Sequence, residues 1–378
     1  MTAKDGRHKL RRGWLAIHSA AVFALVLVVA TMWTRADGDS SDSPTYTTGP
    51  TNAREVSPSI HLPPRELVSL GKDLRAYNPH RPSSHRWMGS DHTHAEDHSN
   101  ISAETQERRF RELGHDFIWL TSHELVVPDP SVDGILHMFG VEAYGANRGD
   151  EPGPHWLALL PDARLAATQE NPFGRYRWKP EEMIDRIAEE GGLPVLAHPS
   201  RYSLPKEKVA ELGERLWGIE GLTSRTSSDE DMPWVDARLS AGEYVCVSAG
   251  TDTHEEDWSL MRGYQLVDLE QVPPTREQLF EQIRECNFFA CTVDGPQHPR
   301  IEEPKLTISK GEIVFSVSGN VDRLELVGRG GRTLATASDT DGVSYRPSGD
   351  EVYVRARARR AAGNAECLSQ AVWLYPRP

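Results

Sequence analysis

The sequence predicts an α/β protein built on a parallel sheet covered by helices, followed by a smaller antiparallel β region. Between about residues 85 and 295, short apolar runs alternate with amphipathic helical patterns, which is typical of consecutive βα units. Seven or so such units in about 210 residues fit a closed or distorted barrel better than an open doubly wound sheet. After about Pro299 the helical patterns stop, and alternating strand patterns follow.

The composition limits the classes of partner. The chain has 378 residues, which allows one large domain and a smaller one, each with its own core. Its formal net charge of −14 argues against nucleic-acid binding, because acidic surfaces release no counterions from a phosphate backbone. A small anionic substrate remains compatible with this charge, since bound divalent cations reverse the sign locally.

The N-terminus predicts a membrane segment rather than part of the fold. Residues 1–12 are basic, and the uncharged run Trp14–Trp33 is long enough to cross a bilayer. We therefore expect a cytoplasmic tail, a transmembrane anchor or signal segment at 13–35, and a flexible linker at 36–60. A retained anchor is favoured, and cleavage near Ala36 would instead release the protein. Either way, the remaining chain is expected to be periplasmic or extracellular.

Four cysteines would then lie in an oxidising compartment. There is no CxxC pair, so a cysteine-based zinc site is not expected. One disulfide is expected between two of Cys286, Cys291 and Cys367. Cys246 lies in the apolar run "YVCV" and is expected to be a free, buried thiol.

The elements follow in order along the chain. The first helix opens on Ser102 and ends at Gly114, and the second has Pro180 in its first turn. Helices are expected at 102–114, 179–192, 206–216 and 234–242. Strands are expected at 116–124, 136–145, 155–161, 193–200, 217–224 and 244–254.

The C-terminal region reads as strands separated by Lys-Gly, Gly-Gly and Gly-Asn turns. Its three runs, 305–319, 323–338 and 351–375, predict a small antiparallel β-sandwich at 300–378, after a barrel domain at 61–299. Within the last run, arginines alternate with small apolar residues at Arg355, Arg357 and Arg359. We expect a solvated strand face there rather than a nucleic-acid-binding stripe.

Metal-binding residue types occur at nearly every predicted strand end. "GSDHTHAEDHSN" places His92 and His94 two residues apart, so that both point to the same face. Further along the chain come His123, Glu142, His155, His198, Glu220, Asp252 and His254. The C-terminal ends of parallel strands in a barrel meet at one mouth. Six imidazoles with carboxylates at that mouth predict a cluster of two or three Zn, Mn or Fe ions.

The order of these motifs resembles the PHP family, the polymerase and histidinol phosphatase domain superfamily, over roughly residues 85–295. HxH is followed by "TSHE", an isolated glutamate, "AHP" and "GTDTH". This resemblance implies a distorted (β/α)₇ TIM-like barrel and a metal-dependent hydrolase, usually of phosphoesters. The sandwich with its "AVWLYP" ending also looks like the tail of some extracytoplasmic PHP proteins.

The resemblance also implies three ligand sets that share one glutamate. The first set is His92, His94, Glu142 and Asp252; the second is Glu142, His155 and His198; the third is His123, His254 and a residue of 96–98. Two departures affect the third set. Ser122 stands where the family commonly has aspartate, and "AEDHSN" replaces "S-D-G". The ligand there is either Asp97 or His98, with His98 slightly favoured.

The resulting hypothesis is hydrolysis of an anionic phosphoester by a water activated between metals. Asp252 or His254 is the candidate for proton transfer, and Arg201 and Arg225 are candidate substrate clamps. An amidohydrolase is disfavoured by the position of Glu142 and by the "DTH" ending. A carboxyl ester or carbamate hydrolase of the PHP type stays open, as does a non-catalytic metal-containing binding protein. The natural substrate is not predicted.

Overall fold

The computed structural model describes residues 67–376 with short internal gaps. The gaps are 72–73, 82, 98, 100, 148–151, 166–171, 202–203, 213–214, 225 and 255–261. The predicted membrane segment and linker, His98 and Arg225 therefore lie outside the described residues. Among the residues that are described, no helix is long and apolar enough to span a membrane. All of them belong to one compact unit, Glu55–Pro378.

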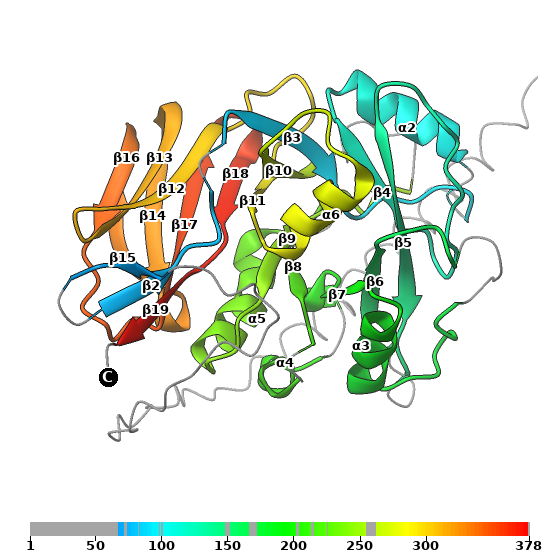
Figure 1. Ribbon diagram of the computed structural model, residues 1–378, viewed down its shortest axis with the longest axis horizontal. Coiled ribbons are helices and arrows are strands. Elements are labelled where there is room, and N and C mark those ends of the chain that lie inside the picture. Colours follow the sequence, from blue (N-terminus) through cyan, green and yellow to red (C-terminus); the bar gives the residue numbers. More distant parts are fainter. Residues whose placement is uncertain are drawn as a thin grey trace, which may run out of the picture. The chain divides into compact units, whose positions relative to one another are not determined.

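A mixed sheet forms the centre of this unit (Figure 1). Its neighbouring strands run in the order β11-β10-β3-β4-β5-β6-β7-β8-β9. In chain order they are β3 His85–Ser90, β4 Phe117–Leu120, β5 Leu136–Tyr144, β6 His155–Leu160, β7 Leu193–Leu196, β8 Gly218–Leu222, β9 Cys246–Ala249, β10 Gly263–Leu269 and β11 Phe288–Thr292. Strands β3 to β5 and β7 to β9 pair in parallel, so the predicted α/β class is confirmed.

Strand β6 differs from the prediction because it is antiparallel to both β5 and β7. Only residues 145–154 separate β5 from β6. A parallel crossover needs about a dozen or more residues, usually including a helix, so this short connection dictates an antiparallel pair. Strands β10 and β11 and the helix between them were not predicted; both strands pair antiparallel with their neighbours.

The hydrogen-bonded ladder stays open between β9 and β3, so the predicted closed barrel is not confirmed. The segments that follow these two strands nevertheless lie side by side. The backbone N–H groups of Thr251 and Asp252 both donate to His92 O at 2.9 Å, and Thr93 forms a bridge with Thr253. Gly250 permits this approach, because a Cβ at that position would collide with the Cβ of His92.

The helices lie mostly where the sequence predicts them. They are α2 Ala103–Glu112, α3 Pro180–Glu189, α4 Lys206–Glu211, α5 Ser228–Ser240 and α6 Arg276–Arg284. Ser102 caps α2 by accepting from Thr105 N at 3.2 Å. Helix α5 begins earlier than predicted, because the Glu230 carboxylate accepts from Ser227 N at 2.7 Å and closes a capping box.

The C-terminal runs form strands as predicted, in two sheets. Strands β12 Glu302–Ser309, β13 Glu312–Val321 and β16 Thr340–Tyr345 make a separate three-stranded sheet. The main sheet takes in β14 Arg323–Gly328, β15 Arg332–Ala337, β17 Tyr353–Arg360, β18 Ala365–Ser369 and β19 Val372–Pro376. The two sets lie beside each other, with Phe315 and Leu326 in one apolar cluster (Figure 1). The β-sandwich itself and its boundary at residue 299 stay predictions.

Two strand pairs connect the C-terminal strands to the rest of the unit. Strand β18 pairs antiparallel with β11, the last strand before residue 299. Strand β2 (Leu74–Tyr77), which pairs with the short β1 (Val68–Ser69), pairs on its other side with β19. The main sheet therefore continues without interruption from the region of the histidines into the C-terminal strands.

The predicted solvated arginine face of β17 is wrong for Arg355, whose residue exposure is 3%. Its Nε and Nη2 donate to the two carboxylate oxygens of Asp236 at 2.9 and 2.8 Å. Arg357 and Arg359 both donate to Asp229, at 2.8 and 2.6 Å. The reason is that α5 covers this face: Asp229 and Asp236 are seven residues apart, so both point from the same side of the helix.

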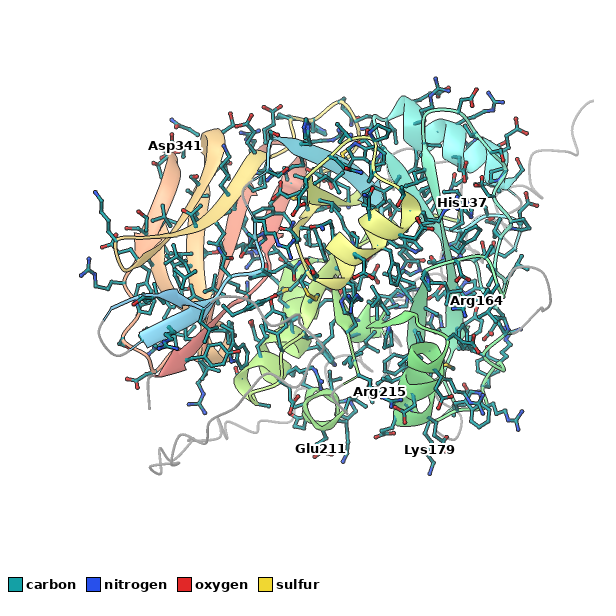
Figure 2. The ribbon with its side chains drawn as sticks, viewed as in Figure 1. His137, Arg164, Lys179, Glu211, Arg215 and Asp341 are labelled. Carbon is teal, nitrogen blue, oxygen red and sulfur yellow. A yellow bond between two sulfur atoms is a disulfide. The ribbon has the colours of Figure 1, made fainter. Side chains whose placement is uncertain are left out.

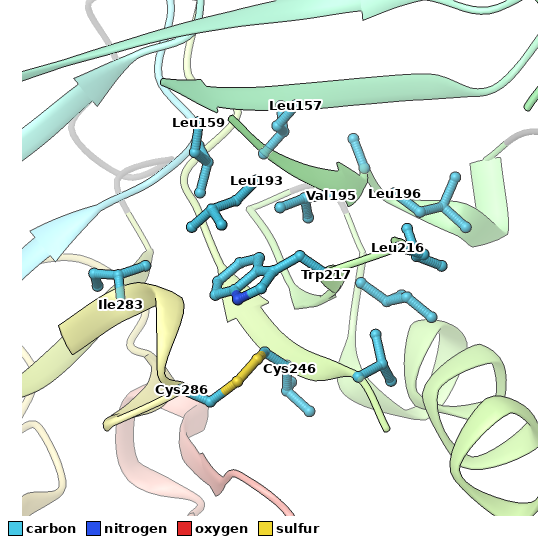
Figure 3. Packing of buried hydrophobic residues seen from close by; sticks show 14 of the residues in the cluster. Leu157, Leu159, Leu193, Val195, Leu196, Leu216, Trp217, Cys246, Ile283 and Cys286 are labelled. Carbon is cyan, nitrogen blue, oxygen red and sulfur yellow. A yellow bond between two sulfur atoms is a disulfide. The ribbon is translucent and has the colours of Figure 1, made fainter. Parts of the chain in front are cut away.

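All four cysteines are paired, as Cys246–Cys286 and Cys291–Cys367. The second bridge joins two of the last three cysteines, as predicted. The prediction of a free Cys246 is wrong, although its apolar surroundings were correct. The first bridge lies beside Trp217 among buried aliphatic side chains (Figure 3). The partner, Cys286, follows α6, an element that the sequence analysis had not placed.

Glu351, in a tight turn before β17, makes the stability of the fold depend on pH. The Glu351 carboxylate accepts hydrogen bonds from Tyr345 Oη at 2.5 Å, Ser348 N at 2.9 Å and Gly349 N at 2.8 Å. Burial alone would raise the pKa of Glu351, but these hydrogen bonds lower it to about 2. The ionised carboxylate therefore stabilises the fold fully above its ordinary pKa, and this contribution is lost as the pH falls towards 2.

We expect Glu351→Gln to lower the free energy of unfolding by about 1–3 kcal/mol at pH 7. The deficit should shrink at pH 3, where the wild-type carboxylate begins to lose its advantage. Urea denaturation of both proteins at the two pH values measures this difference. An equal deficit at pH 7 and pH 3 would contradict the role given to the charge.

Candidate metal centre

The predicted ligands converge at one end of the central strands. His92 and His94 follow β3, and His123 follows β4, while Glu142 lies near the end of β5. The remaining histidine and carboxylate positions are His155 at the start of β6, His198 after β7, and Asp252 and His254 after β9. His155 reaches the same place because β6 is antiparallel and pairs its first residue with the last residue of β5.

Glu142 is fully buried and lies at the centre of the cluster. One carboxylate oxygen, Oε2, lies 3.3 Å from His92 Nε2, 3.1 Å from His94 Nε2 and 3.0 Å from His123 Nδ1. The other oxygen, Oε1, lies 2.6 Å from His155 Nδ1 and 3.1 Å from His198 Nε2. A single carboxylate thus faces two separate sets of imidazoles.

Four groups of donor atoms include this carboxylate or residues next to it. In each group the donor atoms lie within 4.8 Å of one another. The groups are His92, His94, Glu142 and Asp252; Glu142, His155 and His198; His94, His123 and His254; and His92, His198 and Glu220. The first two coincide with the ligand sets implied by the family resemblance. In the third, His94 occupies the place expected for a residue of 96–98.

The donor set fits divalent cations. His92 Nε2 lies 3.2 Å from His94 Nε2, and His123 Nε2 lies 3.2 Å from His254 Nε2, so ring nitrogens face each other across the cluster. Five imidazoles surround the one carboxylate of Glu142. Imidazole nitrogen and carboxylate oxygen are the ligands that Zn²⁺, Mn²⁺ and Fe²⁺ accept.

The pKa shifts of the histidines indicate that positive charge is stabilised near Glu142. Burial opposes protonation of His94, but hydrogen bonds to Asp252, Asp97 and Glu142 outweigh it and raise its pKa to about 10. At the edge, burial and neighbouring imidazoles lower the pKa of His123 to about 3 and that of His254 to about 4. The buried carboxylates thus require compensation, which protons or divalent ions can supply.

Two carboxylates contact the nitrogens of His92 and His94 that face away from Glu142. Glu220 Oε1 lies 3.0 Å from His92 Nδ1, while its Oε2 accepts from His198 N at 2.9 Å. Asp97 Oδ2 lies 2.9 Å from His94 Nδ1 and accepts from His123 N at 3.1 Å. Such contacts set the tautomer and orientation of a ligating imidazole. Asp97 therefore supports the ring of His94 and the backbone of His123, and the role of His98 stays a prediction.

Glu220 lies on β8, at a position predicted as a strand end without an assigned role. We expect Glu220→Gln to weaken divalent metal binding by about 10–100-fold, because His92 would lose its charged support. Competition with a chelating dye measures this affinity. Glu325→Gln, a change at a buried glutamate of β14 paired with Arg323 at 2.8 Å, serves as the control. Equal metal affinities in the two variants would contradict this role for Glu220.

Arg201, the predicted substrate clamp, lies at the edge of the cluster. Its Nη1 donates to Asp252 Oδ2 at 3.0 Å, and 42% of its side chain is exposed. One end of Arg201 is thus held by a candidate ligand while the side chain remains accessible to solvent. The other predicted clamp, Arg225, lies outside the described residues.

A further group of acidic and imidazole side chains lies apart from the cluster, between α2 and β5. His137 Nδ1 lies 2.6 Å from Glu107 Oε1, and both side chains are buried (His137 is labelled in Figure 2). Asp129 completes the group, but it is exposed and accepts from Arg276 at 2.9 Å. This arrangement is a buried hydrogen-bonded pair that joins a helix to the sheet, and it was not predicted from the sequence.

No protein-family model matches this chain, and no curated protein matches it. Solved structures that match include a proposed metal-dependent phosphoesterase from Bifidobacterium adolescentis, at 15% identity and a TM-score of 0.35, covering 44% of this chain and 87% of that one. An amidohydrolase from Chromobacterium violaceum with bound sulfate and no metal also matches, at 15% identity and a TM-score of 0.35, covering 53% and 96%. The molecule is a mixed α/β protein with buried histidine and carboxylate groups that could hold divalent ions.

Proposed function

We propose that the protein is a metal-dependent hydrolase, most simply a phosphoesterase, that works with two or three divalent ions such as Zn, Mn or Fe. The observation that carries this proposal is the position of Glu142, whose two oxygens face two different imidazole sets. A carboxylate shared in this way suits neighbouring metal ions better than one isolated ion.

The residues divide into ligands and groups that handle substrate. His92, His94, Glu142 and Asp252 would hold one ion, and Glu142 with His155 and His198 a second. His123 and His254, with a residue of 96–98, would hold a third. Divalent ions held there would lower the pKa of a coordinated water and withdraw negative charge from the substrate's oxygens.

Two side chains at the edge of the cluster would handle protons and charge. With two ions bound, His254 is not a ligand; its Nδ1 lies 3.4 Å from Asp252 Oδ1 and its ring is partly exposed, so it can then exchange a proton with a bound substrate. Arg201, held by Asp252 and open to solvent, would attract the anionic group of that substrate.

We also propose the overall architecture that the family resemblance implies. The hydrogen bonds between the segments after β3 and β9 support a distorted (β/α)₇ TIM-like barrel. The two sets of C-terminal strands around a shared apolar cluster support a β-sandwich at 300–378. The two disulfides support an extracytoplasmic location, with residues 13–35 as the membrane anchor or signal segment.

Two alternatives stay open. The cluster does not select phosphorus over carbon, so a carboxyl ester or carbamate hydrolase would use the same residues. Ser122 gives some support to a non-catalytic binding protein. Its Oγ accepts from Ala95 N at 2.9 Å, so this position supplies a backbone contact rather than a carboxylate beside His123.

Metal analysis and a substrate panel on the full chain in detergent separate these functions. We expect at least two ions per chain and turnover of phosphomonoesters or phosphodiesters. Turnover of aryl carboxyl esters alone would favour the alternative chemistry. Zero or one ion per chain without any turnover would favour a binding protein.

A further inference from the structure

The metal cluster is sealed on one side and accessible on the other. The side chains of His92, His94 and Glu142 are fully buried. In contrast, 11% of the His123 side chain and 17% of the His254 side chain are exposed. His155 is similar, at 10%. Among the described histidines of the cluster, these three outer rings are the exposed ones, so a substrate can approach past them.

Tyr144 lies against two of the three accessible rings. Its ring stacks on His123 with centroids 4.9 Å apart and an angle of 14° between planes. The same tyrosine meets His155 edge-on at 4.5 Å and 85°. Tyr144 is the last residue of β5, two positions after Glu142, so the strand that supplies the shared carboxylate also supplies this ring.

Two residues of the loop before α3 extend this aromatic surface outwards. The Tyr176 ring lies 5.1 Å from that of Tyr144. The Arg175 guanidinium lies 4.7 Å from the Tyr144 centroid and 4.9 Å from the Tyr176 centroid. We refer to Tyr144, Arg175 and Tyr176 as the aromatic shelf.

The backbone conformation of Tyr176, in the outer part of the shelf, is energetically unfavourable. Tyr176 has a φ of +57°, a left-handed conformation that is unfavourable for a bulky side chain, and the residue is 43% exposed. Its N–H donates to Tyr144 O at 3.0 Å, which holds the strained residue beside the strand. Strain of this kind persists at sites where a position has to be kept for function.

Arg175 adds a positive charge to the shelf, and Glu124 is the carboxylate that acts on it from a longer distance. No carboxylate among the described residues lies within ion-pair distance of its guanidinium, which donates to Tyr176 Oη at 3.2 Å. A cation on an acidic chain, beside a cluster that would bind an anion, favours negatively charged ligands.

We propose that the aromatic shelf binds a planar aromatic group of an anionic ester substrate, next to the ester that reacts at the cluster. This inference rests on the proposed hydrolase function and defines its substrate class. The aromatic group stacks on the exposed ring of Tyr176, while Arg175 attracts the negative charge. Tyr144 sets the distance between that group and the rings of His123 and His155.

The variants separate the ring of Tyr176 from its backbone. Tyr176→Asn removes the ring but keeps a residue that tolerates a positive φ, so the loop is expected to hold its shape. Tyr176→Phe keeps the ring and removes only the hydroxyl. Arg175→Gln removes the charge, and Arg164→Gln, at an exposed arginine paired with Asp162 at 2.9 Å, is its matched control.

Binding of two non-hydrolysable anions to the metal-loaded full chain tests the shelf by calorimetry. Phenylphosphonate and methylphosphonate carry the same anionic group and differ in the ring. We expect wild type and Tyr176→Phe to prefer the phenyl compound by about two- to tenfold, the range of one aromatic contact. Tyr176→Asn should abolish this preference, and Arg175→Gln, unlike Arg164→Gln, should weaken binding of both compounds.

The outcomes distinguish the shelf from the proposed function. Ring-dependent binding without turnover of any ester would support the shelf and overturn the hydrolase. Turnover with equal binding of both phosphonates, in wild type and in Tyr176→Asn, would overturn the shelf and leave the hydrolase standing. A failure of phenylphosphonate to bind at all would also overturn the shelf.

Discussion

Replacing Glu142 with glutamine lowers turnover by at least about 100-fold and reduces the number of metal ions bound per chain. The reason is geometric: the two oxygens of this carboxylate face His94 and His123 on one side and His155 and His198 on the other. The amide supplies only one acceptor oxygen and no negative charge. Elemental analysis of the dialysed protein and initial rates on the best substrate of the panel measure both effects.

The matched control is Glu107→Gln. Glu107 is buried like Glu142 and lies 2.6 Å from a histidine Nδ1, the same distance that separates Glu142 from His155. This control therefore reproduces the loss of a buried Glu–His pair outside the cluster, and it should retain turnover. If Glu142→Gln kept the metal content and the rate of the control, the assignment of the shared ligand would be wrong.

Replacing Asp236 with alanine lowers the free energy of unfolding by about 3–5 kcal/mol. The substitution removes both acceptors of the buried Arg355 guanidinium and also the acceptor of Tyr353 Oη, which donates to Asp236 at 2.7 Å. A charge left unpaired in the interior is more costly than the loss of an exposed pair. Urea denaturation followed by tryptophan fluorescence measures the change.

Asp229→Ala is the control for this prediction. Asp229 accepts from Arg357 and Arg359 on the same helix face, but 67% of its side chain is exposed, so its loss should cost less than about 1 kcal/mol. Adding Arg355→Met to Asp236→Ala should recover much of the stability, because the uncompensated charge is then absent. Similar losses in the two single variants would show that the Asp236–Arg355 pair is not an important source of stability.

The candidate site could be predicted largely from the sequence because its residues occur at strand ends. His92, Glu142, His198 and Asp252 each follow or close an apolar run, and such runs are visible without a structure. The supporting role of Glu220 could have been inferred from its equivalent position on β8. The shelf residues Arg175 and Tyr176 could not, because they come from an irregular loop whose path no periodic pattern reveals.

The elements that depend on hydrogen bonds between residues close in sequence could be predicted. The features that depend on contacts between residues far apart in sequence could not. Helix α2 ends at Glu112, close to the expected Gly114, because capping acts within a few residues. The direction of β6 depends on the length of the connection before it, and the apolar pattern of the strand itself carries no information on that direction. The Cys246–Cys286 bridge and the burial of Arg355 both depend on partners brought near only by the tertiary fold.

The pairing of β18 with β11 has a consequence for the order in which the chain acquires its structure. One edge of β11 is covered by β10, which precedes it, but the other is covered only by residues 365–369. During synthesis, the backbone N–H and C=O groups on this edge of β11 would therefore stay exposed to water until about seventy more residues had been made. The Cys291–Cys367 bridge joins directly opposed residues of these two strands. It can therefore form only after β18 has been made, and it then holds β18 against β11 covalently.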